Sequence, residues 1–260
     1  MSDLVVEARG LGRTFGSGEE GTEALRSIDL SIPSGDFVSL IGPSGCGKST
    51  LLRLIGDLVS PTSGTLTING KSPSQARLDR DYGIVFQSAT LLDWRTVEKN
   101  VELPLEIMGF ESESRAAKAQ EMLALVQLER FAGHYPWQLS GGMQQRVAIA
   151  RALAFNPSIL LMDEPFGALD EMTRELMQQE VLRIWEETGT TVIFVTHSIP
   201  EAVFLSTRVL VMSPRPGRIT DEIMIDLATR RDEDTREAPR YFELITEVRE
   251  ALRQGDRGVA

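Results

Sequence analysis

An eight-residue loop at 42–49 constrains the fold of this chain most, because it fits the pattern G-x-x-x-x-G-K-[ST] without a departure. Residues 37–41 before the loop read as a strand, and the apolar stretch 50–55 after it reads as a helix. Glycines allow a tight curve in which successive backbone N–H groups converge on phosphate oxygens at a helix N-terminus, where the helix dipole favours anions. The sequence therefore predicts a strand, a loop and a helix that together bind phosphate.

Individual roles follow for the residues of this loop. Lys48 should reach the β- and γ-phosphates of a nucleotide, the hydroxyl of Ser49 should bind Mg²⁺, and Thr50 should contact the α-phosphate. A glycine-rich turn that binds nothing is the alternative, which the complete match between a strand and a helix disfavours. The residues that we expect to contact nucleotide here are Gly42, Pro43, Ser44, Gly45, Cys46, Gly47, Lys48, Ser49 and Thr50.

Two carboxylates, Asp163 and Glu164, follow a short apolar run at 159–162. A central strand that ends in charged residues delivers them to the carboxyl edge of a sheet. Asp163 should then hold the Mg²⁺ shell, and Glu164, which points elsewhere, should polarise the attacking water. An acidic pair on the surface is the alternative, and the four apolar residues that run straight into the pair disfavour it.

Strand-like and helix-like stretches alternate through most of the chain, which is typical of an α/β protein with a mainly parallel sheet. Short β-prone pieces predict an antiparallel subsheet, with Asn69-Gly70 as a hairpin signal, and they lie at 4–8, 27–32 and 65–68. Helical spacing of apolar residues between 91 and 155 predicts an inserted helical subdomain, which Asn156-Pro157 ends. We expect one P-loop NTPase domain, with an α/β core and antiparallel β subdomain at 1–90 and 156–225, helices at 91–155 and a short extension at 226–260.

Local signals place the remaining elements. Asp170 should cap a helix over 170–187 that Gly189 closes. The glycine-rich stretch 16–21 shows no periodicity and is expected to be a loop, and the charged segment 230–239 reads as a solvated linker. The other expected elements are strands at 191–195 and 209–212 and a last helix at 240–253.

Composition excludes several classes of protein. The net charge of −11 argues against a protein that wraps nucleic acid, because phosphate binding needs an excess of Lys and Arg. No apolar run approaches the roughly 20 residues that cross a bilayer, and the segment around Asp3 does not resemble a secretion signal. Cys46 is the one cysteine, which excludes an intramolecular disulfide and a cysteine-based zinc cluster. We expect a cytoplasmic protein.

A second anion site is predicted at 139–146, just before an Ala-rich apolar stretch. Ser140 stands at the natural cap of a helix, and Gly141 and Gly142 leave backbone N–H groups open. The stretch Leu-Ser-Gly-Gly-x-Gln resembles the signature motif of ABC ATPases, and together with the loop at 42–49 and the acidic pair it is very specific. The resemblance implies a homodimer that packs head to tail, in which the signature of one subunit closes over the ATP held by the loop of the other.

Other positions also resemble the family. Gln87 is similar to the Q-loop glutamine that senses Mg²⁺ and the γ-phosphate, which gives Ser49, Gln87 and Asp163 as the implied metal set. His197 resembles the switch histidine, so that Lys48, Gln87, Glu164 and His197 are the implied catalytic residues. Asp170 belongs to a stretch similar to the D-loop that couples the two sites, and Phe15 takes the place of the aromatic that stacks on adenine. His134, the other histidine, is expected in a loop with a structural or solvent role.

The resemblance implies ATP hydrolysis that drives transport. Non-transport relatives usually carry long coiled coils, zinc modules or two cassettes, none of which is visible here, and a small-molecule kinase would not explain the signature or His197. Stretches 165–170 and 212–219 resemble the importer branch for nitrate, sulfonate and taurine, although the second stretch would also suit a tight link between two strands. An exporter or a lipid-moving complex is the alternative to an importer.

Partners follow from the same resemblance. An importer subunit of this kind works with integral membrane permease subunits on the inner face of the cell membrane and, through them, with a substrate-binding protein. The cargo contacts those partners rather than this chain. The permease should dock near 88–95, where the apolar residues that could serve docking or core packing are Leu91, Leu92 and Trp94.

Overall fold

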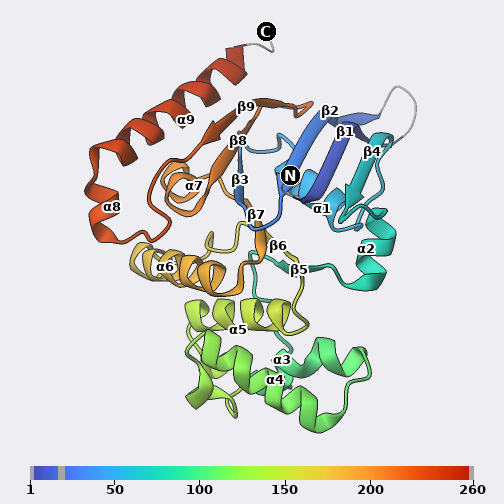
Figure 1. Cartoon of the computed structure of the whole chain (residues 1–260), viewed down its shortest axis with the longest axis vertical. Helices are drawn as coiled ribbons and strands as arrows, with labels where there is room; N and C mark the ends of the chain where they lie inside the picture. Colours follow the sequence, from blue (N-terminus) through green and yellow to red (C-terminus); the bar gives the residue numbers. More distant parts are fainter. Residues whose placement is uncertain (1–2, 17–20, 258–260) are drawn as a thin grey trace.

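A six-stranded, mainly parallel sheet forms the centre of the molecule (Figure 1). The computed structural model describes residues 3–16 and 21–257. Five strands run parallel and the edge strand β9 pairs antiparallel with β8. The strand order across the sheet is β5 (Tyr82–Val85), β6 (Ile159–Asp163), β7 (Thr191–Val195), β3 (Phe37–Ile41), β8 (Arg208–Met212) and β9 (Ile219–Met224). Every residue of β3, β7 and β8 is buried, which explains why these strands are mostly apolar along their length rather than alternating.

A separate antiparallel sheet confirms the predicted subsheet, with strands longer than expected. Its order is β2 (Thr22–Pro33), β1 (Leu4–Phe15) and β4 (Ser63–Ile68). The Asn69-Gly70 turn has positive φ at both residues, as a hairpin turn requires. It closes only a single bridge between Ile68 and Lys71, because the chain continues into α2 (Pro73–Asp79) rather than into a partner strand. The hairpin expectation was wrong beyond the turn itself.

Helices α3 (Val97–Ile107), α4 (Ser112–Leu125) and α5 (Gly141–Leu153) lie together at the end of the molecule away from the antiparallel sheet (Figure 1). They fall inside the predicted insertion at 91–155. One continuous cluster of buried apolar side chains joins them to the parallel sheet, and Leu123, Val147 and Phe194 belong to it. The helices therefore share a core with the sheet.

Three other helices cover the sheet: α1 (Lys48–Ile55), α6 (Glu171–Thr188) and α7 (Ile199–Leu205). The predicted caps of α6 are confirmed. Asp170 accepts a hydrogen bond from the N–H of Thr173 at 3.0 Å, and Gly189 ends the helix with φ of 62°. The left-handed conformation at Gly189 is the usual reason for glycine at this place.

The C-terminal segment is packed more tightly than a solvated linker, which corrects the expectation for 230–239. It forms the short helix α8 (Glu233–Glu237) and the long helix α9 (Pro239–Arg257). Arg231 is 7% exposed, and its guanidinium donates to the carbonyl oxygens of Phe204 at 2.7 Å, Ala228 at 2.9 Å and Val203 at 3.3 Å. Burial lowers the pKa of Arg231 to about 10.

Two further expectations concern the loop at 16–21 and membrane-spanning segments. Within the predicted loop 16–21, residues 17–20 lie outside the described residues. Among helices of the described part of the chain, none is long and apolar enough to cross a membrane.

Replacing Arg231 with Ala should lower the free energy of unfolding by about 1–3 kcal/mol, because buried carbonyl groups lose their hydrogen-bond donor. The matched control is Arg230→Ala at the exposed neighbouring position, which should change the free energy by no more than about 0.5 kcal/mol. Urea unfolding followed by circular dichroism measures both values. Equal effects of the two substitutions would show that the C-terminal segment is not anchored through Arg231.

Candidate nucleotide site

The loop at 42–49 connects β3 to α1, as the sequence predicts. Gly45 and Gly47 have φ of 75° and 111°, a region that side chains other than glycine rarely adopt. The ammonium group of Lys48 donates to the carbonyl oxygens of Gly42 at 2.8 Å and Pro43 at 3.2 Å. The loop therefore curves around the Lys48 side chain, and a positive charge lies at the N-terminus of α1, where the helix dipole also favours anions.

A hydrogen bond joins this loop to the acidic pair. The hydroxyl of Ser49 donates to Oδ1 of Asp163 at 2.8 Å, across an interval of 114 residues in the chain. A hydroxyl and a carboxylate are oxygen ligands of the kind that Mg²⁺ takes alongside water and substrate phosphates. Within residues 3–16 and 21–257, no group of three or more His, Cys, Asp or Glu could hold a metal on its own. The donor set fits a cation that shares its shell with a nucleotide.

Glu164 turns the chain sharply away from the strand. Its φ of 49° lies in the left-handed region, an unusual and strained conformation for a residue with a side chain. Its N–H donates to the carbonyl oxygen of Val195 at 3.0 Å. As a result Asp163 faces Ser49, whereas Oε2 of Glu164 lies 3.3 Å from Nδ1 of His197, whose side chain is 65% exposed. The two neighbouring carboxylates thus have separate partners, as the sequence predicts.

Gln87 lies next to the segment that follows Glu164. A Cβ atom added to Gly167 would lie 2.9 Å from Nε2 of Gln87, so the two residues are in direct contact. The preceding residue is tied to the signature helix, because the side-chain amide of Gln145 donates to the carbonyl oxygen of Phe86 at 2.9 Å. The structure therefore brings Gln87 to the same edge of the sheet as Glu164.

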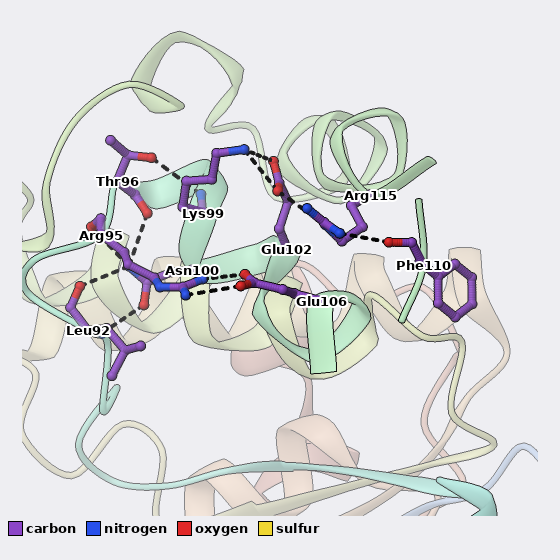
Figure 2. A network of polar contacts seen from close by, with 9 residues as sticks. All are labelled: Leu92, Arg95, Thr96, Lys99, Asn100, Glu102, Glu106, Phe110 and Arg115. Atoms are coloured by element: carbon purple, nitrogen blue, oxygen red, sulfur yellow. Dashed lines mark hydrogen bonds and ion pairs between the residues drawn. The ribbon is translucent and has the colours of Figure 1, made fainter. Parts of the chain in front are cut away.

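Asn100 anchors the segment that follows Gln87, a role that sequence reasoning missed. Figure 2 shows this buried amide at the start of α3, bonded to three residues of the incoming chain. Its Oδ1 accepts from the N–H of Leu92 at 2.7 Å, and its Nδ2 donates to the carbonyl oxygens of Thr96 at 3.0 Å and of Leu92 and Arg95 at 3.1 Å. No motif marks an asparagine that serves as a local anchor, so nothing in the sequence indicated it.

Ion pairs around the buried carboxylate of Glu102 continue the same network. Glu102 lies next along α3, where Lys99 donates to it at 2.7 Å and Arg115 of α4 lies 3.7 Å away (Figure 2). Arg95 and Glu106 form a second, more exposed pair at 2.6 Å. The Arg95–Glu106 pair holds the segment after Gln87 to α3, and the contact between Glu102 and Arg115 holds α3 to α4.

The signature residues lie beside α6 rather than beside the phosphate loop of the same chain. Ser140 caps α5 by accepting from the N–H of Met143 at 3.3 Å. A Cβ atom on Gly142 would lie 2.7 Å from Thr173, so glycine allows α5 to approach α6, and Gly141 adjoins Leu169. Helix α5 and helix α1 belong to different parts of the molecule (Figure 1). The two predicted anion sites therefore lie in different parts of the same chain.

Two further predicted residues have partners within the chain. The carboxylate of Asp170 accepts from the N–H and hydroxyl of Thr173, and these bonds hold the pKa of Asp170 below its ordinary value. The ring of Phe15 is partly exposed, with the guanidinium of Arg13 at 4.5 Å from its centroid. Contacts of Asp170 and Phe15 with a nucleotide remain predictions.

The turn at 213–217 links β8 to β9 and also packs against the phosphate loop. Gly217 donates its N–H to Ala24 at 2.9 Å and accepts from the N–H of Arg26 at 3.0 Å. A Cβ atom on Gly217 would lie 2.0 Å from the carbonyl oxygen of Cys46. Cys46 itself is buried, and burial raises the pKa of its thiol. The turn therefore packs directly against the backbone of the phosphate loop at Cys46.

Replacing Gly217 with Ala should displace the backbone at Cys46, since the overlapping atom is a carbonyl oxygen that cannot rotate away. We expect nucleotide affinity to fall by about tenfold, equivalent to roughly 1.4 kcal/mol. Calorimetric titration with ATP measures the affinity. The control is Gly133→Ala, where an added Cβ would meet nothing within 4 Å. Unchanged affinity in both variants would show that the turn does not support the loop.

Comparisons with known proteins agree with this geometry. Residues 25–167 match the family model described as ABC transporter. The taurine import ATP-binding protein of Rhizobium johnstonii is 50% identical over 234 residues, covering 88% of each chain. The nitrate import ATP-binding protein of Synechocystis is 43% identical over 256 residues, covering 95% of each.

Solved structures agree as well. A dimeric ATP-binding cassette in a post-hydrolysis state, bound to ADP and Pi, is 41% identical, with a TM-score of 0.74 over 86% of this chain and all of that one. CbiO1 from Clostridium perfringens, part of an ABC transporter complex, is 26% identical with a TM-score of 0.78, over 97% of this chain and 98% of that one. This chain belongs to the ABC transporter family, as an ATP-binding subunit that hydrolyses ATP.

Proposed function

We propose that this chain powers import of a small solute through a separate membrane permease, by hydrolysing ATP between two copies of itself. The observation that carries the mechanism is the pair of contacts at one sheet edge, from Ser49 to Asp163 and from Glu164 to His197. The curated relatives named above support import, since both are import ATP-binding proteins.

Phosphoryl transfer to water needs positioning and charge neutralisation more than covalent chemistry. Lys48 and the N–H groups of the loop would bind the phosphates and neutralise their charge. Ser49, Gln87 and Asp163 would hold Mg²⁺, which supplies further positive charge when it is bound. The carboxylate of Glu164 would accept a hydrogen bond from the attacking water and take its proton.

His197 is suited to orient that carboxylate. Its Nδ1 lies 3.3 Å from Oε2 of Glu164, and the exposed ring is free to approach a bound phosphate. Two rigid elements carry the pair, because Glu164 follows β6 and His197 follows β7, and these strands are neighbours in the sheet. A water between the carboxylate and the γ-phosphate would therefore be held from two sides.

The second anion site explains why two copies are needed. The start of α5 is formed by Ser140, Gly141 and Gly142. Within the same chain the two glycines contact Leu169 and Thr173 rather than the phosphate loop. In a head-to-tail homodimer they would cover the nucleotide held by the loop of the other copy. The dimeric, nucleotide-bound cassette of similar fold supports this arrangement.

A groove of about 410 Å³ beside α3 is the proposed docking site for a cytoplasmic helix of the permease. It lies between the β5 edge of the sheet and α3, and its apolar lining residues include Tyr82, Ile84, Leu103, Pro104, Ile107, Met108 and Phe155. Ile107, one of these lining residues, is 73% exposed. Arg151 lines the groove and donates to the carbonyl oxygens of Ala89 and Thr90, so this side chain connects the groove lining to the segment after Gln87.

The apolar residues that the sequence predicts for docking near 88–95 differ in their exposure. Trp94 is 74% exposed and suits a contact surface, whereas Leu91 packs against the apolar core. Docking at the groove and at Trp94 would place the subunit on the inner face of the cell membrane. A substrate-binding protein would act on it only through the permease, and the proposed cargo is of the nitrate, sulfonate or taurine type.

Replacing Glu164 with Gln should retain ATP binding and reduce turnover by roughly a hundredfold to ten thousandfold, because the amide cannot take the proton of the water. ATP should then hold the variant as a dimer, which light scattering detects. Phosphate release and ATP titration give turnover and affinity. Glu250→Gln, on the exposed side of α9, serves as control. Turnover at the wild-type rate in Glu164→Gln would contradict the assigned role.

Replacing Ile107 with Glu should block docking by putting a charge into the apolar groove, with an expected loss of roughly tenfold or more in affinity for the permease. ATP hydrolysis by the subunit alone should be unchanged. The control is Phe242→Glu, an exposed apolar residue on α9. Copurification with the coexpressed permease measures docking, and equal recovery of both variants would exclude this groove.

A further inference from the structure

Glu201 is a buried carboxylate that the mechanism above does not use. It lies in the first turn of α7 and is 6% exposed. The hydroxyl of Thr196 donates to its Oε2 at 2.6 Å. Its Oε1 accepts from the side-chain amide of Gln178 at 3.3 Å and lies 3.5 Å from Nε of Arg174. These partners, one in the loop after β7 and two on α6, connect Glu201 to three segments of the chain, and breaking any of the contacts leaves the buried charge less well compensated.

The first of these segments carries His197. Thr196, which donates to Glu201, also accepts from the N–H of Ser198 at 3.0 Å. The hydroxyl of Ser198 accepts in turn from the N–H of Glu201 at 3.4 Å. Both neighbours of His197 are therefore bonded to Glu201, one through its side chain and the other through its backbone. An exposed imidazole is thus carried on a restrained backbone.

The second segment is the loop that follows Glu164. Arg174, which faces Glu201, donates from Nη2 to the carbonyl oxygen of Leu169 at 2.9 Å. Leu169 adjoins Gly141 at the start of α5. Through Arg174, the carboxylate is therefore connected to the loop at 165–170 that leads from Glu164 to the cap of α6 and lies beside the signature.

The third segment is the C-terminal extension. Gln178, which donates to Glu201, accepts from Nη2 of Arg236 at 2.6 Å. The Arg236 guanidinium stacks at 3.7 Å from the ring centroid of Phe204 in α7. The hydrogen-bonded chain thus runs from α8 through α6 to the loop that holds His197, and each of its side chains has a partner.

We propose that Glu201 is a positioning residue for ATP hydrolysis, which fixes the backbone of His197 relative to the loop at 165–170. A shift of that loop moves Arg174, and Glu201 passes the shift to Thr196 and hence to the histidine. Transmission between the two nucleotide sites rests on the proposed homodimer, in which the loop at 165–170 lies beside the signature that covers the partner's nucleotide.

The test compares Glu201→Gln and Thr196→Val with the control Glu247→Gln, on the exposed side of α9. Both network variants nearly keep the size of the side chain. Glu201→Gln removes the charge, and Thr196→Val removes the bond to Glu201 together with the bond from the N–H of Ser198. We expect kcat for ATP to fall by roughly tenfold to a hundredfold, as for a misplaced catalytic group, with KM changed by less than about twofold. The control should match the wild type in both constants. Melting temperatures establish that the variants are folded.

A double-mutant cycle separates positioning from a purely structural role. The effects of Thr196→Val and Arg174→Met on kcat should be non-additive, because both act through Glu201, and the coupling should vanish when Glu201→Gln is also present. Additive effects, or a fall in kcat that is matched by weaker ATP binding and a lower melting temperature, would overturn the proposal. If the wild type does not hydrolyse ATP, the proposed function fails; if the wild type does and Glu201→Gln equals the control, only this proposal fails.

Discussion

The hydrogen bond between Ser49 and Asp163 joins the two halves of the nucleotide site and depends on the order of the parallel strands. Ser49 belongs to the helix that follows β3, and Asp163 ends β6, which is separated from β3 by β7. All three strands run parallel, so their carboxyl ends meet at one edge. His197 follows β7 and therefore falls at the same edge. An antiparallel β7 would have placed the histidine at the opposite end of the sheet, away from Glu164.

In the proposed function, binding of nucleotide would reach the permease through the helices α3 to α5. Their shared apolar core favours small, concerted displacements, because a packed interface does not deform continuously. Polar contacts determine which loops are attached to these helices. Asn100 binds the segment after Gln87 to α3, and Gln145 binds Phe86 to α5, so the Gln87 loop is held to the helices at both of its ends.

Sequence reasoning succeeded where the chemistry is local. The loop at 42–49 and the acidic pair each stand next to a predicted strand, and Ser49 and Asp163 are assigned to the same metal site. The structure joins these two residues by a hydrogen bond across 114 residues of the chain. Sequence reasoning failed where the structure depends on contacts that no local sequence pattern specifies. Asn69-Gly70 forms its turn, but no second strand follows it to complete a hairpin. Arg231 lies inside a charged stretch of sequence and is nevertheless buried, because it donates to carbonyl oxygens of α7. Asn100 and Glu201 belong to no recognised pattern. The partners of Asn100 are backbone groups of the preceding segment 92–96, and those of Glu201 lie in α6 and in the loop after β7.

A carboxylate at position 201 is difficult to explain by stability alone. Replacing a buried ion pair with well-packed apolar side chains is often neutral or stabilising, so a buried ion pair is weak evidence for a role in stability. An apolar side chain could pack between α6 and α7, but it could not accept from Thr196 and face Arg174 at once. Those two contacts reach the histidine loop and the loop at 165–170, which hydrolysis must align. The charge is therefore better understood as a means of setting geometry than as a source of folding energy.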